Sequence, residues 1–327
     1  MRALTWIPSV TRLRAIVRIG LCVGIWIQPP AWAIEWVPIG DAPNLPDPRT
    51  GRGAVSAPFE ISRCEITCSE YAEFLNAVAG AGDPHGLWDP RMDSPKTAAN
   101  QDDGKPRFIR RSGTPGAYRY AVYAGEERKP VRFVNYLSAL RMANWLHHGA
   151  ITGAPTEFGA YEMRSGKSPD SRENGARVWL PDENEWYKAA YFHPASAGGP
   201  AGGYWMFPCR SDQAPDFALP GSVTAARTNV AAVAVEERAN AKDWFIVGDV
   251  GSFQAAASHY GTVDQAGNVW EWVETPVFGN QRILRGGSSS HPPIKTRSDI
   301  RTSMQPELSF AYVGFRLARS MKCTSEK

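Results

Sequence analysis

Long apolar runs, cysteine and net charge are all scarce in this sequence of 327 residues, and each scarcity excludes a class of protein. The apolar run from Ile19 to Ile27 is too short to cross a bilayer, and no later run in the sequence is longer. Residues 1–33 hold four arginines and no acid; removing these from 36 basic residues leaves 32, against 33 acidic residues. A chain so close to neutral does not favour nucleic acid or an anionic membrane surface as a partner.

The N-terminal residues have the order of a secretory signal peptide. A basic stretch precedes the apolar run, and Ala31-Trp32-Ala33 supplies small residues for a cleavage site. We expect residues 1–33 to be removed and the protein to be exported, to the periplasm or out of the cell; a short membrane anchor is the alternative. Removing 33 of 327 residues leaves 294, enough for one large domain or two small ones. We expect the mature protein not to span a membrane.

Four cysteines remain after residue 33, namely Cys64, Cys68, Cys209 and Cys323. Export permits disulfides, and four cysteines allow three connectivities among which the sequence does not choose. If Cys64 and Cys68 lie in one strand, they are ~13 Å apart, which is beyond disulfide reach. Buried free thiols are therefore as reasonable an expectation as disulfides.

Three helices are predicted from capping residues followed by apolar side chains at helical spacing. The predicted helix starts are Ser69, Asn135, and Asp182 with Glu185 as an acidic variant of the capping box. Residues 34–57 are interpreted as an irregular leader and residues 80–128 as a long loop. Beyond residue 194 helix signals nearly vanish. A chain so poor in regular structure needs another means of fixing its loops, and bound cations are one such means in exported proteins.

The stretch VDQAGNVWEWVE, residues 263–274, supports two interpretations. Asp264 and Glu271 are hard oxygen ligands on either side of a turn that Gly267 and Asn268 allow, which is the chemistry that calcium prefers. Alternatively, the stretch is a hairpin in a tryptophan-rich core. The residues alone leave these two interpretations open.

Five segments in order resemble the formylglycine-generating enzyme family, also called the sulfatase-modifying factor domain. They are CEITCSEYAEFL, PVRFVNYLSALRMANWL, VWLPDENEWYKAAY, YGTVDQAGNVWEWV and LRGGSSS followed by VGFRLAR. The resemblance implies an α+β fold, a variant of the C-type-lectin-like fold with few helices, over residues 58–320, with residues 321–327 as a tail. It also implies two structural calcium sites. The ligands would be Asp264, Gly267, Val269 and Glu271 in one site, and Asn229, Val230, Asp243 and Phe245 in the other.

Catalytic members of the family are copper-dependent oxidases in which two cysteines bind Cu(I), because soft thiolates suit that ion. Here the first cysteine position is His291 and the second is Thr296, so the resemblance implies the site's shape without its copper ligands. Copper is therefore not expected. A related branch of iron-dependent sulfoxide synthases places an H-x-x-x-H-x-E pattern on an added helical bundle. None of the six histidines falls in that pattern, so we do not expect this activity either.

Three classes of function remain, and whether the chain is an enzyme is left open. The first is a non-catalytic, calcium-stabilised scaffold that binds an unknown protein or glycan. The second is a divergent formylglycine-generating oxidase acting on sulfatases. The third is an enzyme with other chemistry in the same cleft, where a cationic pocket for an anionic ligand would be formed by Arg285, Ser288, Ser290 and Arg297 beside His291. Fold resemblance alone does not decide the chemistry.

Overall fold

The computed structural model describes residues 33–93, 107–164, 168–217, 227–228 and 247–321. Its α-helices are α1 (Cys68–Val78), α2 (Tyr136–His147) and α3 (Glu183–Tyr191). Its strands are β1 (Trp36–Ile39), β2 (Phe59–Ser62), β3 (Ile109–Ser112), β4 (Arg119–Val122), β5 (Val178–Trp179), β6 (Asp216–Phe217), β7 (Arg227–Thr228), β8 (Trp270–Pro276), β9 (Arg282–Arg285), β10 (Thr302–Met304), β11 (Val313–Phe315) and β12 (Ala318–Ser320). Short 3-10 turns η1 to η5 make up the remaining regular elements. The predicted α+β class, with few helices, is confirmed.

The helix starts follow the capping rules. Asn135 caps α2, and Asp182 forms a reciprocal box with Glu185 at α3, as the sequence predicts. The predicted start at Ser69 is wrong, because Thr67 is the cap of α1. Glu70 stands three residues after Thr67, and its carboxylate accepts a hydrogen bond from the Thr67 backbone N–H at 2.7 Å. The residue three after Ser69 is Ala72, which has no side-chain acceptor.

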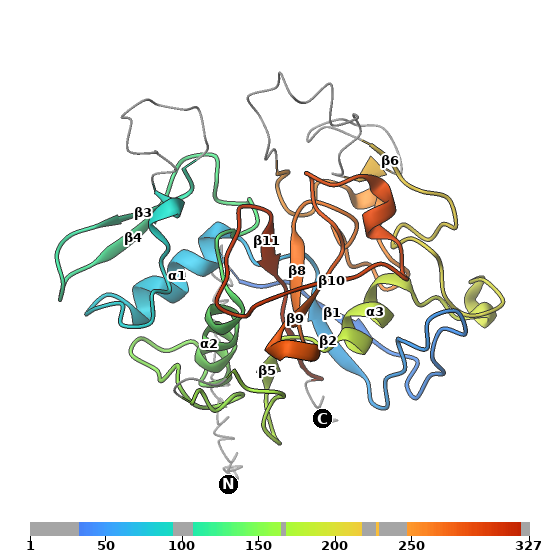
Figure 1. The fold of residues 1–327 in the computed structure, drawn as a ribbon, viewed down its shortest axis with the longest axis horizontal. Helices are drawn as coiled ribbons and strands as arrows, with labels where there is room; N and C mark the ends of the chain where they lie inside the picture. The colour runs from blue at the N-terminus through green and yellow to red at the C-terminus, as the bar shows by residue number, and fades with distance from the viewer. Residues whose placement is uncertain (1–32, 94–106, 165–167, 218–226, 229–246, 322–327) are drawn as a thin grey trace, which may run out of the picture. The chain divides into compact units, whose positions relative to one another are not determined.

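Two four-stranded sheets carry the fold. One has the order β1-β2-β12-β5 and the other β10-β9-β8-β11 (Figure 1). Strand β12 joins the two ends of the domain, because Arg319 pairs with Glu60 of β2 and with Val178 of β5. Helix α2 packs beside β5 and α3 packs beside β8. The largest cluster of buried side chains includes residues of both sheets and of all three helices.

The described parts of two segments interpreted as irregular contain strands. Within residues 34–57, β1 pairs with β2, and buried Asp47 accepts a hydrogen bond from the Tyr187 hydroxyl at 2.6 Å. Residues 80–128 contain the β3–β4 hairpin, in which Arg111 pairs with Tyr120. These strands are short, have one solvent-exposed face and are separated by turns rich in proline or glycine. Their apolar residues therefore show little alternation, and the sequence pattern did not reveal the strands.

Within the described residues, no helix combines the length and the apolar character needed to cross a bilayer. The predicted signal peptide, residues 1–33, falls almost wholly outside the described residues.

Candidate functional site

The loop after β9 approaches its neighbours closely, and its two glycines make this approach possible. Gly286 and Gly287 both have positive φ, 95° and 76°. A Cβ on Gly286 would lie 3.3 Å from the Trp186 ring, and one on Gly287 would lie 3.1 Å from the Thr296 methyl carbon. The glycine pair therefore holds the loop against α3 and against its own following turn.

His291 is held by two hydrogen bonds to one ring nitrogen. Its Nδ1 lies 2.6 Å from the Ser288 Oγ and 3.3 Å from the Trp270 Nε1. Because an indole N–H can only donate, Nδ1 is the acceptor, and the neutral imidazole carries its proton on Nε2. Burial and, to a lesser degree, the nearby Lys295 lower the pKa of His291, which favours this neutral form. His291 therefore presents an N–H donor on its other edge.

Thr296, at the second cysteine position, faces inward. It is fully buried, its hydroxyl donates to the Pro293 carbonyl at 2.8 Å, and its own carbonyl accepts from the Tyr191 hydroxyl at 2.9 Å. The pair His291 and Thr296 thus offers one imidazole and no sulfur. These residues do not fit the two-thiolate Cu(I) centre of the family's oxidases.

Of the residues expected to form a cationic ligand pocket, two are buried and all four have partners within the loop or beside it. Arg285 is fully buried over the Trp186 and Tyr187 rings, and it donates to the Ser298 carbonyl at 2.8 Å. Ser288 is fully buried as well, and Arg297 pairs with Asp299 at 2.5 Å. Ser290 donates its backbone N–H to the Ser288 hydroxyl at 3.3 Å. Arg285 and Ser288 therefore support the loop from inside.

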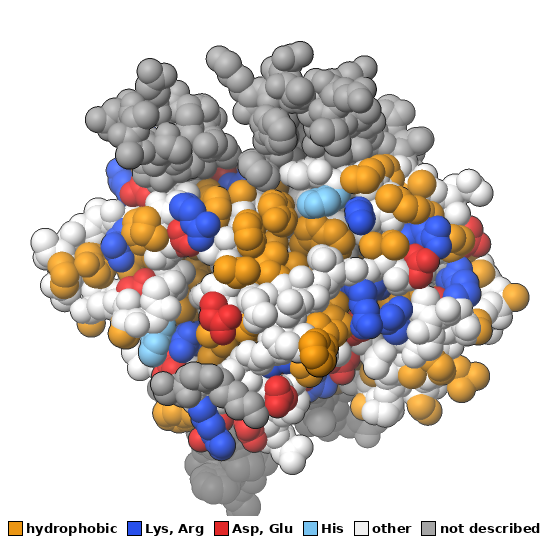
Figure 2. All heavy atoms as spheres, in the orientation of Figure 1, with side chains coloured by type: hydrophobic (Ala, Val, Ile, Leu, Met, Phe, Trp, Pro, Cys, Tyr) orange, Lys and Arg blue, Asp and Glu red, His pale blue; other side chains and the backbone are white. Residues whose placement is uncertain are grey.

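Partly exposed aromatic rings lie beside His291. We call this group, made of His291, Tyr312, Phe310 and Phe133, the aromatic face. The ring of His291 meets Tyr312 edge-on at 5.7 Å, and Tyr312 stacks on Phe310 at 5.3 Å. The Phe133 N–H donates to the Phe310 carbonyl at 3.0 Å, which extends the group. Figure 2 shows hydrophobic side chains gathered over β8 and β11 on this side of the molecule.

The first expected calcium site lies in a buried cluster of charges. Both carboxylate oxygens of Glu271 accept from Arg316, at 2.6 and 2.7 Å, and both side chains are fully buried. Asp264 accepts the Gly251 N–H at 2.5 Å through Oδ2, while its buried Oδ1 has no partner among the described residues. Burial raises the pKa of Asp264 to about 6 and, together with Asp264 and Glu271, raises that of Glu65.

This cluster has more carboxyl groups than cations, and burial favours the neutral forms of Glu65 and Asp264. Three carboxylates, those of Glu65, Asp264 and Glu271, share one guanidinium, and Glu65 Oε2 also lacks a partner among the described residues. Within that part of the chain, no group of three or more His, Cys, Asp or Glu side chains is arranged to hold a metal ion. Calcium here would therefore depend on the carbonyls of Gly267 and Val269 as well as on the acids.

Other expected ligands are not placed. Asn229, Val230, Asp243 and Phe245 lie outside the described residues. Cys64, Cys68 and Cys209 are free thiols, and burial raises the pKa of each, to about 11 for Cys209. Cys323 also lies outside the described residues.

Sequence reasoning missed the aromatic face and the contact between Ser288 and His291. It considered Ser290, the chain neighbour of His291, whereas the tight turn from Ser288 to His291 brings the earlier serine to the ring. A serine three residues before a histidine within a glycine-led loop is the signal that could have indicated this contact. Tyr312 comes from a distant segment, and only the pairing of β11 with β8 brings it there.

Comparison with known proteins agrees with these observations. Residues 43–321 match the sulfatase-modifying factor enzyme 1-like domain. The chain is 26% identical over 287 residues to the hercynine oxygenase of Mycolicibacterium smegmatis, covering 80% of this chain and 52% of the relative. It is 24% identical over 280 residues to the hercynine oxygenase of Mycobacterium tuberculosis, again covering 52% of the relative. The chain thus spans about half the length of the curated relatives that it matches.

Among solved structures, that of CarF has a TM-score of 0.51 at 18% identity and covers 89% of this chain and 100% of that chain. This likeness supports the fold alone. The domain match spans most of the chain and includes the loop after β9, the Glu271–Arg316 pair and all three helices. The chain is therefore a member of the sulfatase-modifying factor, or formylglycine-generating enzyme, domain family.

Proposed function

We propose that this protein is an exported binding domain of its family and not a copper oxidase. The observation that carries the proposal is the chemistry of the two cysteine positions. His291 offers a nitrogen already engaged by Ser288 and Trp270, and the Thr296 hydroxyl is satisfied inside the loop. A site without thiolate sulfur lacks the ligands that hold Cu(I), so the oxidase step has no metal to begin from.

The proposed ligand is a protein or a glycan, and the aromatic face is its contact surface. Partly exposed rings offer apolar area at a low cost in side-chain entropy, which is why aromatic residues are frequent in recognition sites. The outward Nε2–H of His291 adds one directional donor beside Tyr312. Tyr312→Ala should therefore weaken ligand binding without unfolding the domain, because Tyr312 is only partly buried.

Calcium is the proposed structural cation at Asp264 and Glu271. The buried, unpartnered Asp264 Oδ1 and Glu65 Oε2 support this proposal, because a bound cation would give a partner to oxygens that have none among the described residues. Export is proposed from the signal-like residues 1–33, and extracellular compartments supply the millimolar calcium that weak protein sites require.

A second candidate is an enzyme with other chemistry at the same loop. Two observations favour it: the relatives are named hercynine oxygenases, and the Ser288 hydroxyl lies 2.6 Å from the imidazole of His291. Full burial of Ser288 counts against its use as a nucleophile, because a substrate carbon could not reach its oxygen.

A conversion assay tests whether the protein is a copper oxidase. Purified protein is supplied with Cu(I), oxygen and a peptide carrying a sulfatase cysteine motif, and the aldehyde product is measured by mass spectrometry. The proposal predicts no product above the level given by a His291→Ala variant. Product formed by the natural protein and lost in that variant would contradict the proposal and would restore the oxidase function.

A further inference from the structure

A pocket outside the aromatic face lies where the β8–β9 hairpin meets β10, the outer strand of its sheet. Its volume is about 360 Å³, within the range of small-ligand sites. Val277 and Phe278 supply apolar lining, and Gln281, Thr302 and Ser303 supply polar groups around Arg301. Its lining residues include no carboxylate.

The hairpin tip presents Phe278 entirely to solvent. The side chain is 100% exposed, although it belongs to a tight turn that the Val277 N–H closes on the Gln281 carbonyl at 2.9 Å. Gly279 and Asn280 have positive φ, 75° and 62°, which directs the turn. A large apolar ring held in water by a closed turn is a candidate ligand contact, because nothing else in the described residues covers it.

The charge beside this pocket is positive. Arg301 binds Glu183 at 2.7 Å, and the same carboxylate lies 3.3 Å from Arg52 and 3.9 Å from Arg285. Three guanidinium groups thus lie within 4 Å of one carboxylate, and of these Arg301 lines the pocket. The Arg301 side chain is 39% exposed, so part of its donor fork remains accessible from the pocket. Figure 2 shows Lys and Arg side chains gathered over α3 on this side.

The neutral polar groups are arranged as donors. Ser303 donates its hydroxyl proton to Gln281 Oε1 at 2.6 Å, which orients the Gln281 amide. The NH₂ group of Gln281 has no partner among the described residues and can donate to a ligand oxygen. Thr302 adds a hydroxyl at the same wall of the pocket.

We propose that this pocket binds an anionic glycan through a uronic acid residue. The carboxylate lies on the Arg301 fork, the sugar hydroxyls bond to Gln281, Thr302 and Ser303, and the apolar face of the sugar packs on Phe278. Arginine matches carboxylate geometry, and one cation among several neutral donors fits a single acid on a hydroxylated ring better than it fits a run of acidic side chains. This site shares no residue with the aromatic face and does not depend on the function proposed there.

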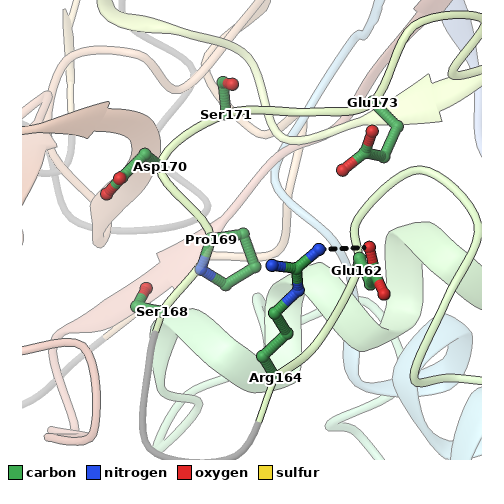
Figure 3. A pocket seen from close by; sticks show the side chains of 7 residues that line it. All are labelled: Glu162, Arg164, Ser168, Pro169, Asp170, Ser171 and Glu173. Carbon is green, nitrogen blue, oxygen red and sulfur yellow. Dashed lines mark hydrogen bonds and ion pairs between the residues drawn. The ribbon is translucent and has the colours of Figure 1, made fainter.

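A second pocket of about 240 Å³ provides the control. It is lined by Glu162, Asp170 and Glu173 together with Arg164, which binds Glu162 at 2.9 Å (Figure 3). An exposed arginine is present in both pockets, but here the carboxylates outnumber it. An anionic ligand should therefore avoid this pocket.

The test is calorimetric titration of the full purified chain with trigalacturonate and with the neutral galactose trisaccharide of the same linkage. We expect trigalacturonate to bind and the neutral sugar to bind at least about tenfold more weakly. Arg301→Gln and Phe278→Ala should each raise the Kd for trigalacturonate, about tenfold or more for the arginine, while Arg164→Gln should leave it unchanged. Added salt should weaken the interaction.

Several outcomes would overturn the proposal. They are absence of binding, equal binding of the two sugars, or equal loss in Arg164→Gln. Binding of poly-glutamate that depends on Arg301 and exceeds that of trigalacturonate would assign the pocket to an acidic protein segment instead. Arg301→Lys keeps the charge and removes the fork, so a folded Arg301→Lys protein with reduced affinity distinguishes loss of recognition from loss of fold. Copper and aldehyde assays bear on His291 alone and would leave these outcomes unaffected.

Discussion

Arg316→Met should destabilise the domain severely, because the Arg316 guanidinium is paired with the fully buried Glu271. Its guanidinium donates twice to Glu271, at 2.6 and 2.7 Å. It also donates to the carbonyls of Ser62, Arg63 and Val263, at 3.0 to 3.1 Å. Methionine fills a similar volume but supplies none of these hydrogen bonds.

The size of the loss in unfolding free energy follows from the groups that Arg316→Met leaves without a partner. Removing one partner of a buried ion pair costs about 3–5 kcal/mol, and three carbonyls also lose a donor. Because Glu65 and Asp264 lie in the same cluster, the remaining charge is repulsive as well. We expect the free energy of unfolding to fall by roughly 3–5 kcal/mol, or a large part of the stability of an ordinary domain.

Urea unfolding followed by tryptophan fluorescence measures this change. Arg164→Met is the control, because Arg164 is exposed and an exposed ion pair such as that with Glu162 contributes little to stability. Saturating calcium should restore part of the loss in Arg316→Met if a cation binds at Asp264 and Glu271. A loss below about 1 kcal/mol in Arg316→Met would refute the assignment of this pair as the support of the cluster.

Three further changes test the local structure. Glu70 and Glu185 are buried, and burial raises the pKa of each from 4.5 to about 7, so their protonated forms are favoured in the folded state. The free energy of unfolding of the calcium-free protein should therefore fall as pH rises from about 5 to about 7. Denaturant melts measure this change, and stability that rises over this window would contradict these shifts. Thr67→Ala removes the cap of α1 and should cost about 1 kcal/mol in urea melts, whereas Ser69→Ala should cost much less. Gly287→Ala places a Cβ 3.1 Å from Thr296 at a φ of 76°, and a loss of at least about 1 kcal/mol is expected; an unchanged melting curve would show that the loop tolerates a side chain there.

The helices and the shape of the site loop could be predicted because their determinants are local. Asn135, and Asp182 with Glu185, cap their helices through side-chain bonds within three residues. The Gly286–Gly287 pair belongs to the LRGGSSS segment of the resemblance, and both of its glycines have positive φ in the loop. The α1 start was misplaced by two residues because Thr67 and Ser69 are both good caps, and only the Glu70 side chain distinguishes them.

The side chains that surround the site come from segments far apart in the sequence, and a single sequence does not show which of these segments will be in contact. Arg285 was expected beside a ligand, yet the aromatic rings of α3 enclose it. Tyr312 and Arg316 reach their positions only because β11 lies parallel to β8 and brings the end of the chain to the middle of the sheet. The short strands of the β3–β4 hairpin carry arginine on both strands, so their hydrophobic period is weak.

The most direct test of the central claim is elemental analysis of the purified mature protein, with and without prior exposure to Cu(I). The absence of thiolate at positions 291 and 296 predicts no stoichiometric copper after dialysis against buffer containing millimolar calcium, with calcium bound. Stoichiometric copper that His291→Ala abolishes would contradict the account, because it would show that the loop holds the metal of the family's oxidases with different ligands.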